Sequence, residues 1–377
     1  MTRYRVLHLR FEALSPLTFP TRKPGTQFQA SLPYIPGAVV YGALGADDLI
    51  RPHLDQLRCR NAYPTNGPDA SWVRPLPVTA LKPKGSTGTP QDSLVGRVCW
   101  ERQQPTALVY APTDKTGRAW EASSGFYGYQ GGTFRTHSVE QRIVTRVAIN
   151  RERGVAEDTR LYSPLVLQEG SRFVGSIAVP EDVKVLATPP STLRIGGRQH
   201  SGMGRVAIEQ IAVSDEQLET TADAATALLN RIDQLTQRFQ ARAALYERLG
   251  GAAWEIKPRS IFTINLLSDA LLLEHGWFPS QTLRLEELGL RFEATLLRAF
   301  TATQVMGGWN VQWQIAKPTV LATRMGGLWV FEAERSLTED DCTALLALQN
   351  TGVGERCAEG FGQVRICDEF HTRSEEI

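Results

Sequence analysis

The stretch LRIGGRQHSGMGRVAI, residues 193–208, is typical of a strand, a glycine loop and a second strand. Almost the same ending returns 158 residues later in GVGERCAEGFGQVRI, residues 352–366. Glycines let the backbone take positive φ, and exposed amides of such a loop can hold phosphate oxygens. In the first copy Arg194, Arg198 and Arg205 add positive charge. Both loops run into strands, whereas a dinucleotide-binding loop would run into a helix.

A longer internal repeat surrounds the two loops. LVLQEGSRFVGSIAV (165–179) parallels TVLATRMGGLWVFEA (319–333), since each has two apolar strands around a glycine turn. A strand with alternating apolar residues precedes each unit: Leu7, Leu9, Phe11 and Ala13 in the first, and SIFTINLL (260–267) in the second. Two units of strand–helix–strands–helix–strand predict an α+β fold with two ferredoxin-like domains.

Composition breaks define the expected domain boundaries. We predict an N-terminal domain at 1–213 with a proline-rich irregular insertion at about 61–133, and a C-terminal domain at 252–377. Between them a long helix is expected at 214–251, with a capping box at Ser214 and Gln217. Its apolar heptads suit either a coiled-coil partner or, as we favour, packing on its own domain. A shorter helix is expected at 38–50, after Pro36-Gly37.

Charge and cysteine usage limit the possible functions. The 377 residues carry a net charge of only +1, so nucleic acid would have to meet a local patch. Seven of the 41 basic residues are Lys, leaving 34 Arg, which reflects either phosphate binding or a GC-rich genome. The five cysteines form no CxxC pair, and we predict neither a metal nor another cofactor. Without a signal peptide or an apolar span, a cytoplasmic protein with no membrane contact is expected.

The order of the motifs resembles a known family. SPL, YIPGAVVYGALG, LYSPLVLQEGSRFVGSI and GGRQHSGMGRV follow one another as in the RAMP superfamily of CRISPR–Cas systems. GGWNVQW…AKP (307–318) and GVGERCAEGFGQV are similar to the Csx-type, handle-binding subunit of type III-D effector complexes. The resemblance covers roughly residues 4–50, 134–213 and 260–366.

The resemblance implies two ferredoxin-like (RRM-like) RAMP domains and a role in antiviral defence. Such a subunit binds CRISPR RNA, clamps its 5′ repeat-derived handle and nucleates assembly. Its expected partners are the large polymerase-like effector subunit and backbone RAMP subunits. It is expected to be non-enzymatic.

Candidate RNA-binding residues come from the loops, from a helix start that favours anions and from an arginine-rich strand region. They are Arg22, Lys23, Tyr34, Gly37, Arg135, His137, Arg142, Arg146, Arg194, Gly197, Arg198, His200, Gly202, Gly204 and Arg205. Four aromatic residues could stack on unpaired bases or pack in a core: Phe126, Tyr127, Tyr129 and Phe134.

Two other functions fit the same residues. A metal-independent endoribonuclease that processes precursor RNA could use His200 or His137 as acid or base. A purely structural scaffold could dock partners on the long helix. The second glycine loop carries Glu355 and Glu359, which would repel phosphate and suit protein contacts.

Overall fold

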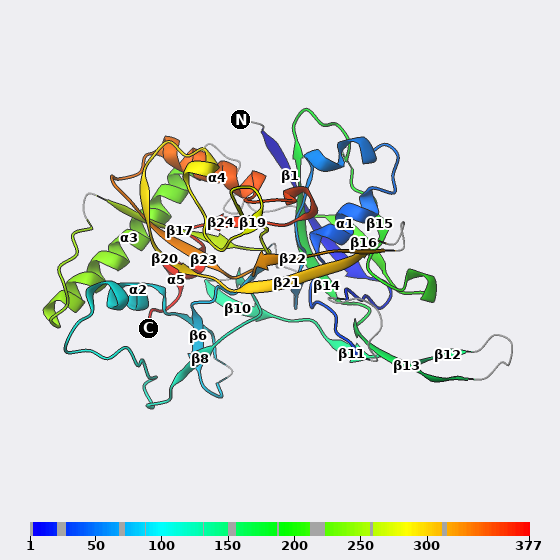
Figure 1. Cartoon of the computed structure of the whole chain (residues 1–377), viewed down its shortest axis with the longest axis horizontal. Coiled ribbons are helices and arrows are strands. Elements are labelled where there is room, and N and C mark those ends of the chain that lie inside the picture. Colours follow the sequence, from blue (N-terminus) through cyan, green and yellow to red (C-terminus); the bar gives the residue numbers. More distant parts are fainter. Residues whose placement is uncertain are drawn as a thin grey trace.

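The computed structural model of the chain describes residues 3–20, 28–67, 72–86, 88–130, 132–149, 156–186, 188–211, 223–256, 259–310 and 315–377. They form a mixed α/β structure with many strands and few helices. Two main sheets lie side by side, one from each half of the chain (Figure 1). No helix in the described ranges is long and apolar enough to cross a membrane.

The first sheet has the strand order β15–β16–β1–β14, and both β3 and β4 pair with β14. Its strands are β1 (Tyr4–Ala13), β3 (Arg58–Cys59), β4 (Tyr63–Thr65), β14 (Arg172–Pro180), β15 (Thr192–Arg194) and β16 (Arg205–Gln210). The predicted alternation of β1 is confirmed, because Leu7, Leu9, Phe11 and Ala13 are all buried in one core.

Helix α1 (Gly37–Leu44) packs Val40 and Leu44 on this core. It begins one residue before the predicted start at Ala38 and ends well before Ile50. Gly45 caps it, and the Asp47 carboxylate then accepts a hydrogen bond from the Leu49 amide (2.8 Å), which favours a turn over further helix. A 3-10 helix, η1 (Arg51–Gln56), follows.

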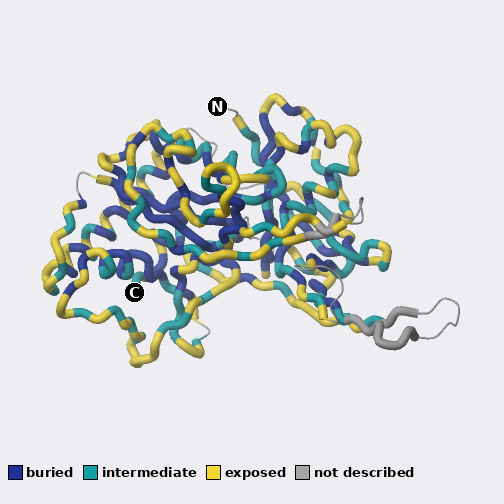
Figure 2. The backbone as a smooth tube through the Cα atoms, in the orientation of Figure 1, coloured by how far each residue is buried: buried dark blue, intermediate teal, exposed yellow. Residues whose placement is uncertain are grey.

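The second sheet has the order β20–β23–β17–β24, with β17 (Ser260–Leu266), β20 (Ala294–Phe300), β23 (Leu328–Ala333) and β24 (Val364–Ile366). Although the sequence of β17 alternates, all its residues are buried (Figure 2). Helices α3 (Ala224–Arg248) and α4 (Glu339–Thr351) pack in its core, while the polar positions Thr263 and Asn265 face the C-terminal helix α5 (Glu369–Arg373) through hydrogen bonds.

Helix α3 packs on its own domain, as favoured above. Ile232, Phe239 and Tyr246 of its heptad stripe are buried in the second core. The predicted capping box at Ser214 and Gln217 lies outside the described residues. Helix α2 (Leu94–Gln103) falls within the range predicted as an irregular insertion, yet it packs against α3 and enters the same second core.

The rest of the insertion is more regular than its prolines suggest. It forms two three-stranded sheets, β10–β9–β5 and β7–β6–β8. Their strands are β5 (Arg74–Pro75), β6 (Ala80–Pro83), β7 (Gln91–Asp92), β8 (Trp120–Ala122), β9 (Phe126–Gln130) and β10 (Thr133–His137). Prolines are tolerated because most of these strands are short edges.

Each unit also carries a β-ribbon before its third main strand. In the first, β11 (Gln141–Ile143) and β12 (Arg146–Ile149) pair with β13 (Ala156–Leu167), which β2 (Phe28–Gln29) joins in parallel. In the second, β21 (Thr303–Asn310) pairs with β22 (Ile315–Thr323). Figure 1 shows β12 and β13 projecting away from the first sheet, whereas β21–β22 lies across the middle of the molecule. A small hairpin, β18 (Leu273–Glu274) and β19 (Phe278–Pro279), and the turn η4 (Glu286–Leu288) precede β20.

Candidate nucleic-acid interface

The two glycine loops have the same backbone conformation. Each is ten residues long, 195–204 and 353–362, and its second, fourth, eighth and tenth residues have positive φ. These residues are Gly196, Arg198, Gly202 and Gly204 in the first loop, and Gly354, Arg356, Gly360 and Gly362 in the second. Short turns, η2 (Gln199–Ser201) and η5 (Cys357–Glu359), lie at matching positions. The sequence repeat is therefore also a repeat of backbone geometry.

Loop amides that were predicted to hold phosphate already donate to carbonyls of their own chain. The bonds are Gly197 to Thr18 (2.9 Å), Gly204 to Pro16 (3.0 Å) and Gly202 to Gln199 (3.2 Å). A Cβ on Gly204 would lie 2.4 Å from the Ile195 carbonyl oxygen. Gly204 therefore allows close packing. The engaged amides correct the predicted phosphate role of Gly197, Gly202 and Gly204.

Two arginines beside the first loop are arranged differently. Arg194 on β15 and Arg205 on β16 are directly opposite each other across the antiparallel pair, and both are exposed. Within the described part of the chain neither has an acidic partner. Like charges opposite each other on a sheet repel, which costs stability unless an anion lies between them. This pair is the strongest anion-binding feature of the first unit.

Arg198 and His200 lie within the same loop. Arg198 has a left-handed backbone (φ 59°), and its guanidinium donates to the Gln29 Oε1 atom at 2.8 Å. His200, on η2, is exposed. Because both side chains share the loop that joins Arg194 to Arg205, the structure brings four predicted residues together at one edge of the sheet.

Neighbouring charges on the sheet face that carries Arg205 cancel in pairs. Arg10 contacts Glu209 at 3.1 Å, and Arg172 contacts Glu12 at 3.3 Å. The excess positive charge of this face therefore concentrates at the loop end.

The second glycine loop packs against the first unit at Gly360, while residues 354–356 are exposed. A Cβ on Gly360 would lie 2.4 Å from the Cys59 carbonyl oxygen and 3.0 Å from the Gly37 Cα atom. Its arginine is neutralised, since Arg356 and Glu359 form a two-bond ion pair (2.7 and 2.6 Å). The sequence suggested protein contacts for this loop, and the contact observed is with the chain's own first domain.

Gly37 is therefore covered, which corrects the predicted anion site. Its amide donates to the Asn61 Oδ1 atom at 2.8 Å, and the residue is buried. Asn61 thus takes the place that an anion would occupy at this helix start.

Tyr34 and His137 are also buried, which corrects their predicted contacts with RNA. Tyr34 packs with Tyr63 and Phe126, with ring centroids 5.6 and 6.0 Å away. The His137 ring accepts a hydrogen bond from the Asn66 amide (3.2 Å), and burial, with a smaller effect of Arg135, lowers its pKa.

Of the four aromatic residues proposed to stack on bases, two are buried in the core and two, Tyr129 and Phe134, are partly buried. Phe126 and Tyr127 are buried, and Tyr127 contacts Phe134 and Phe370 edge-on. Core packing, the alternative reading of this group, therefore holds for these two.

The arginine-rich region spreads over three strands. Arg142 on β11 and Arg146 on β12 are opposite residues 166 and 162 of β13, so the register keeps them on one side of the ribbon. Arg142 is paired with Glu169 at 2.8 Å, and Arg135 on β10 is exposed. Arg22 and Lys23 lie outside the described residues.

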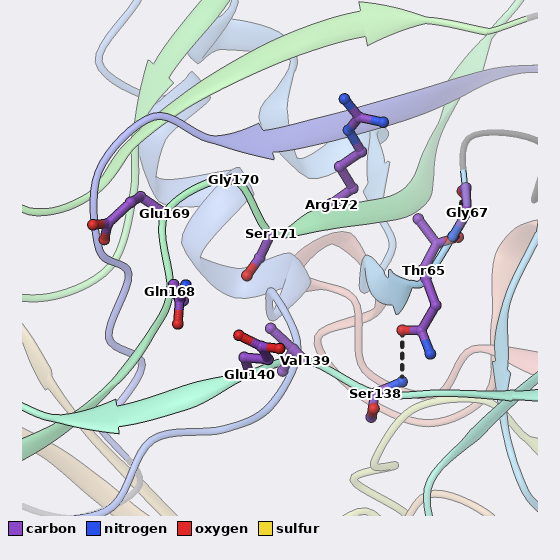
Figure 3. A pocket seen from close by; sticks show the side chains of 11 residues that line it. Thr65, Gly67, Ser138, Val139, Glu140, Gln168, Glu169, Gly170, Ser171 and Arg172 are labelled. Carbon is purple, nitrogen blue, oxygen red and sulfur yellow. Dashed lines mark hydrogen bonds between the residues drawn. The ribbon is translucent and has the colours of Figure 1, made fainter.

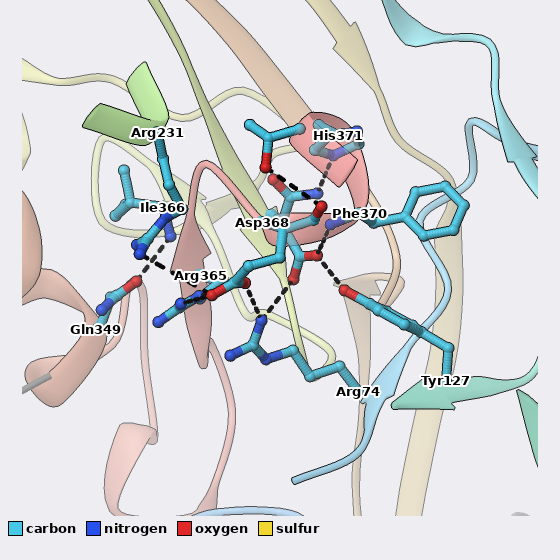
Figure 4. A network of polar contacts seen from close by, with 12 residues as sticks. Arg74, Tyr127, Arg231, Gln349, Arg365, Ile366, Asp368, Phe370 and His371 are labelled. Atoms are coloured by element: carbon cyan, nitrogen blue, oxygen red, sulfur yellow. Dashed lines mark hydrogen bonds and ion pairs between the residues drawn. The ribbon is translucent and has the colours of Figure 1, made fainter. Parts of the chain in front are cut away.

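A buried polar network joins the C-terminal segment to the insertion, and sequence reasoning missed it (Figure 4). Glu369 receives ion pairs from Arg74 and Arg365, and Asp368 accepts from the Tyr127 hydroxyl. Its members are far apart in sequence and follow no motif. The only signal in the sequence was that acidic and basic residues are both present in these segments.

His371, in the same network, is fully buried between two partners. Its Nδ1 atom lies 2.7 Å from Asp92 Oδ2, and its Nε2 atom lies 2.7 Å from Asn265 Nδ2. Burial alone lowers the pKa of this imidazole, but the Asp92 carboxylate outweighs it, and the pKa of His371 is raised. Complete burial keeps the pair from substrates, so we assign it to stability.

The His371–Asp92 pair predicts a pH-dependent stability. A raised folded pKa gives stabilisation that is fully present below the unfolded value of about 6.5 and lost as pH rises through the folded value. The destabilisation caused by His371→Gln should therefore be larger at pH 6 than at pH 9, by on the order of 1 kcal/mol. Urea unfolding of both proteins at the two pH values measures it, and equal losses would contradict it.

Comparison with known proteins gives distant structural similarities. No family model matches the sequence, and no curated protein matches it. A chain of the type III-B Cmr-beta complex bound to cognate target RNA and AMPPnP is 12% identical, with a TM-score of 0.41 over 86% of each chain. A chain of the type III-B Cmr-beta complex bound to cognate target RNA is 13% identical, with a TM-score of 0.42 over 86% of each chain. A chain of a type IV-B CRISPR complex is 13% identical, with a TM-score of 0.27 over 58% of this chain and all of that one.

Proposed function

We propose that the chain is a non-enzymatic CRISPR RNA-binding subunit of a type III effector complex, of the III-D kind. It clamps the 5′ repeat-derived handle and nucleates assembly with the large polymerase-like subunit and backbone RAMP subunits in the cytoplasm. The proposal starts from the motif order IPG, glycine loop, GWN and second glycine loop.

We infer that each main sheet is the core of a ferredoxin-like unit. Counting main strands along the chain, both sheets have the order fourth, first, third, second. Helix α1 follows the first strand in one unit, and α4 precedes the last strand in the other. This order is that of the split βαβ fold, to which RNA-binding domains of this type belong.

One observation carries the proposed RNA contact: Arg194 and Arg205 are exposed, opposed and without acidic partners in the described chain. Two guanidiniums on adjacent strands can each donate paired hydrogen bonds to consecutive phosphates. Arg198 and His200 in the adjoining loop extend this surface. Such contacts supply affinity and position, and not sequence choice.

The surface favours binding over cleavage. Metal-independent cleavage needs an acid and a base around one 2′-hydroxyl. His200 is exposed, but His137 is buried on another sheet with its ring engaged by Asn66. A His200→Ala variant is therefore expected to bind RNA and to leave its integrity unchanged. Loss of a cleavage activity in this variant would favour the endoribonuclease instead.

The double variant Arg194→Ala/Arg205→Ala tests the contact directly. We expect its affinity for handle RNA to fall roughly 10²- to 10⁴-fold, because two contacts are lost and hydrogen bonds to charged groups each contribute on the order of 1.5–3 kcal/mol. The slope of log affinity against log salt should fall by about 1.4, or about 0.7 for each lost phosphate contact. Fluorescence anisotropy over a salt series measures both.

A matched control is Arg248→Ala/Arg291→Ala, which removes the same charge from exposed positions in the second half. It should leave affinity and slope nearly unchanged. Equal losses in the two double variants would indicate a general charge effect and contradict the assigned surface. Sequencing of RNA that co-purifies with the tagged chain must also return short RNAs with one repeat-derived end. Random RNA or none would favour the scaffold alternative.

A further inference from the structure

The turn between the last ribbon strand and the third main strand occurs twice with one geometry. Gly170 and Gly326 both have a φ of 81°. Each amide donates to the end of the first main strand, Gly170 to the Ala13 carbonyl and Gly326 to the Leu266 carbonyl, both at 2.8 Å. The two turns are therefore structurally equivalent and can be compared directly.

In the second unit an extended segment covers this turn. The Val78 amide donates to the Gly326 carbonyl at 2.9 Å, and a Cβ on Gly326 would lie 2.7 Å from the Leu76 carbonyl oxygen. The covering residues belong to the insertion, in the sequence RPLPVTA (74–80). Gly326 is buried as a result.

In the first unit the same turn is open. Gly170 is exposed, a Cβ there would meet no atom within 4 Å, and its carbonyl has no hydrogen-bond donor in the described chain. A pocket of about 380 Å³ adjoins it (Figure 3). Residues from three segments line the pocket: Thr65, Asn66, Gly67, Ser138, Val139, Glu140, Gln168, Glu169, Gly170, Ser171 and Arg172.

We propose that this pocket docks an extended polypeptide segment of another protein, in the way that the insertion docks on Gly326. The segment would donate a backbone N–H to the Gly170 carbonyl, and its basic side chain would pair with Glu140, which is exposed at the rim. This mode of recognition uses main-chain hydrogen bonds for affinity and side chains for choice. It goes beyond the proposed RNA contact and does not depend on it.

The charges of the lining favour protein over RNA. Glu140 has no basic partner among the described residues, whereas Glu169 is paired with Arg142 at 2.8 Å and the Arg172 guanidinium is paired with Glu12 at 3.3 Å, so the uncompensated charge of the lining is the Glu140 carboxylate. Carboxylates repel phosphate, whereas they attract a lysine or an arginine.

A peptide with the sequence of residues 74–80 is the probe, because it carries the covering backbone and one arginine. With a photo-reactive leucine at position 76, it should label the full-length protein in residues 65–67, 138–140 or 168–172, as mapped by mass spectrometry. N-methylation of its valine removes the N–H donor that the Gly170 carbonyl would accept, and should reduce labelling at least tenfold. Glu140→Lys should reduce it severalfold.

Three outcomes would overturn the proposal. Labelling elsewhere on the protein, or labelling that survives N-methylation, would show that the Gly170 carbonyl is not the acceptor. The pocket would be assigned to nucleic acid by two results together. A short single-stranded RNA would have to protect the pocket from peptide labelling, and the Glu140→Lys variant would have to bind that RNA more tightly than the unmodified protein does. Failure of the RNA contact at Arg194 and Arg205 would leave this result untouched, so the two proposals fail separately.

Discussion

Replacing Glu369 with glutamine is expected to lower the free energy of unfolding by about 3–5 kcal/mol. Glu369 is buried among three guanidiniums, those of Arg365 (3.2 Å to Nε), Arg74 and Arg231 (3.9 Å). Glutamine keeps the shape of the side chain but removes its charge. The variant would leave three buried or partly buried guanidiniums without their main counter-charge. Removing one partner of a buried ion pair is strongly destabilising because the remaining charge is left uncompensated.

The control for this variant is Glu375→Gln, the same change at an exposed position in the same C-terminal segment. It should alter stability by no more than about 0.5 kcal/mol. Urea unfolding of the two variants and the unmodified chain gives the comparison. Similar losses for both would show that the buried network does not stabilise the fold.

The effect of Glu369→Gln should also depend on pH. Burial raises the pKa of a carboxyl, but Arg365, Arg74 and Arg231 hold the pKa of Glu369 well below its usual range. A depressed folded pKa gives stabilisation that is present above the unfolded value of about 4.3 and lost as pH falls below it. The gap between the variant and the unmodified chain should therefore narrow in acid.

Gly37→Ala is expected to lower the free energy of unfolding by about 3 kcal/mol, the upper end of the range that overpacking typically causes. A Cβ at Gly37 would lie 1.9 Å from the Cys59 carbonyl oxygen and 3.0 Å from the Gly360 Cα atom. Both neighbours are backbone, so relief requires movement of α1 away from the second glycine loop. The substitution would therefore disturb the packing of the two halves of the chain as well as the first core.

Gly42→Ala in the same helix is the matched control. A Cβ there meets no atom within 4 Å, and alanine is the better helix former by about 1 kcal/mol. This variant should be as stable as the unmodified chain or more so. Thermal unfolding that ranks Gly37→Ala level with Gly42→Ala would contradict the close contact between α1 and the second loop.

Some expectations from sequence failed for one physical reason: a motif does not show what covers it. Pro36-Gly37 does begin a helix, but Asn61 and the second glycine loop, distant in sequence, close its N-terminus. His137 ends strand β10 two residues after Arg135, yet its ring is turned inward to Asn66. The proline-rich insertion contains a helix, α2, whose apolar residues pack in the second core.

The sequence by itself determined the features that depend on local backbone chemistry. Alternation placed the inward face of β1, and the glycine spacing determined two loops with the same φ pattern, because only a few residues accept positive φ. Tertiary structure alone decided which groups stay accessible. It engaged the loop amides within the chain, left Arg194 and Arg205 opposed and exposed, and assembled Asp92, Asn265 and His371. Burial and pairing are set by contacts between distant segments, and no local pattern records them.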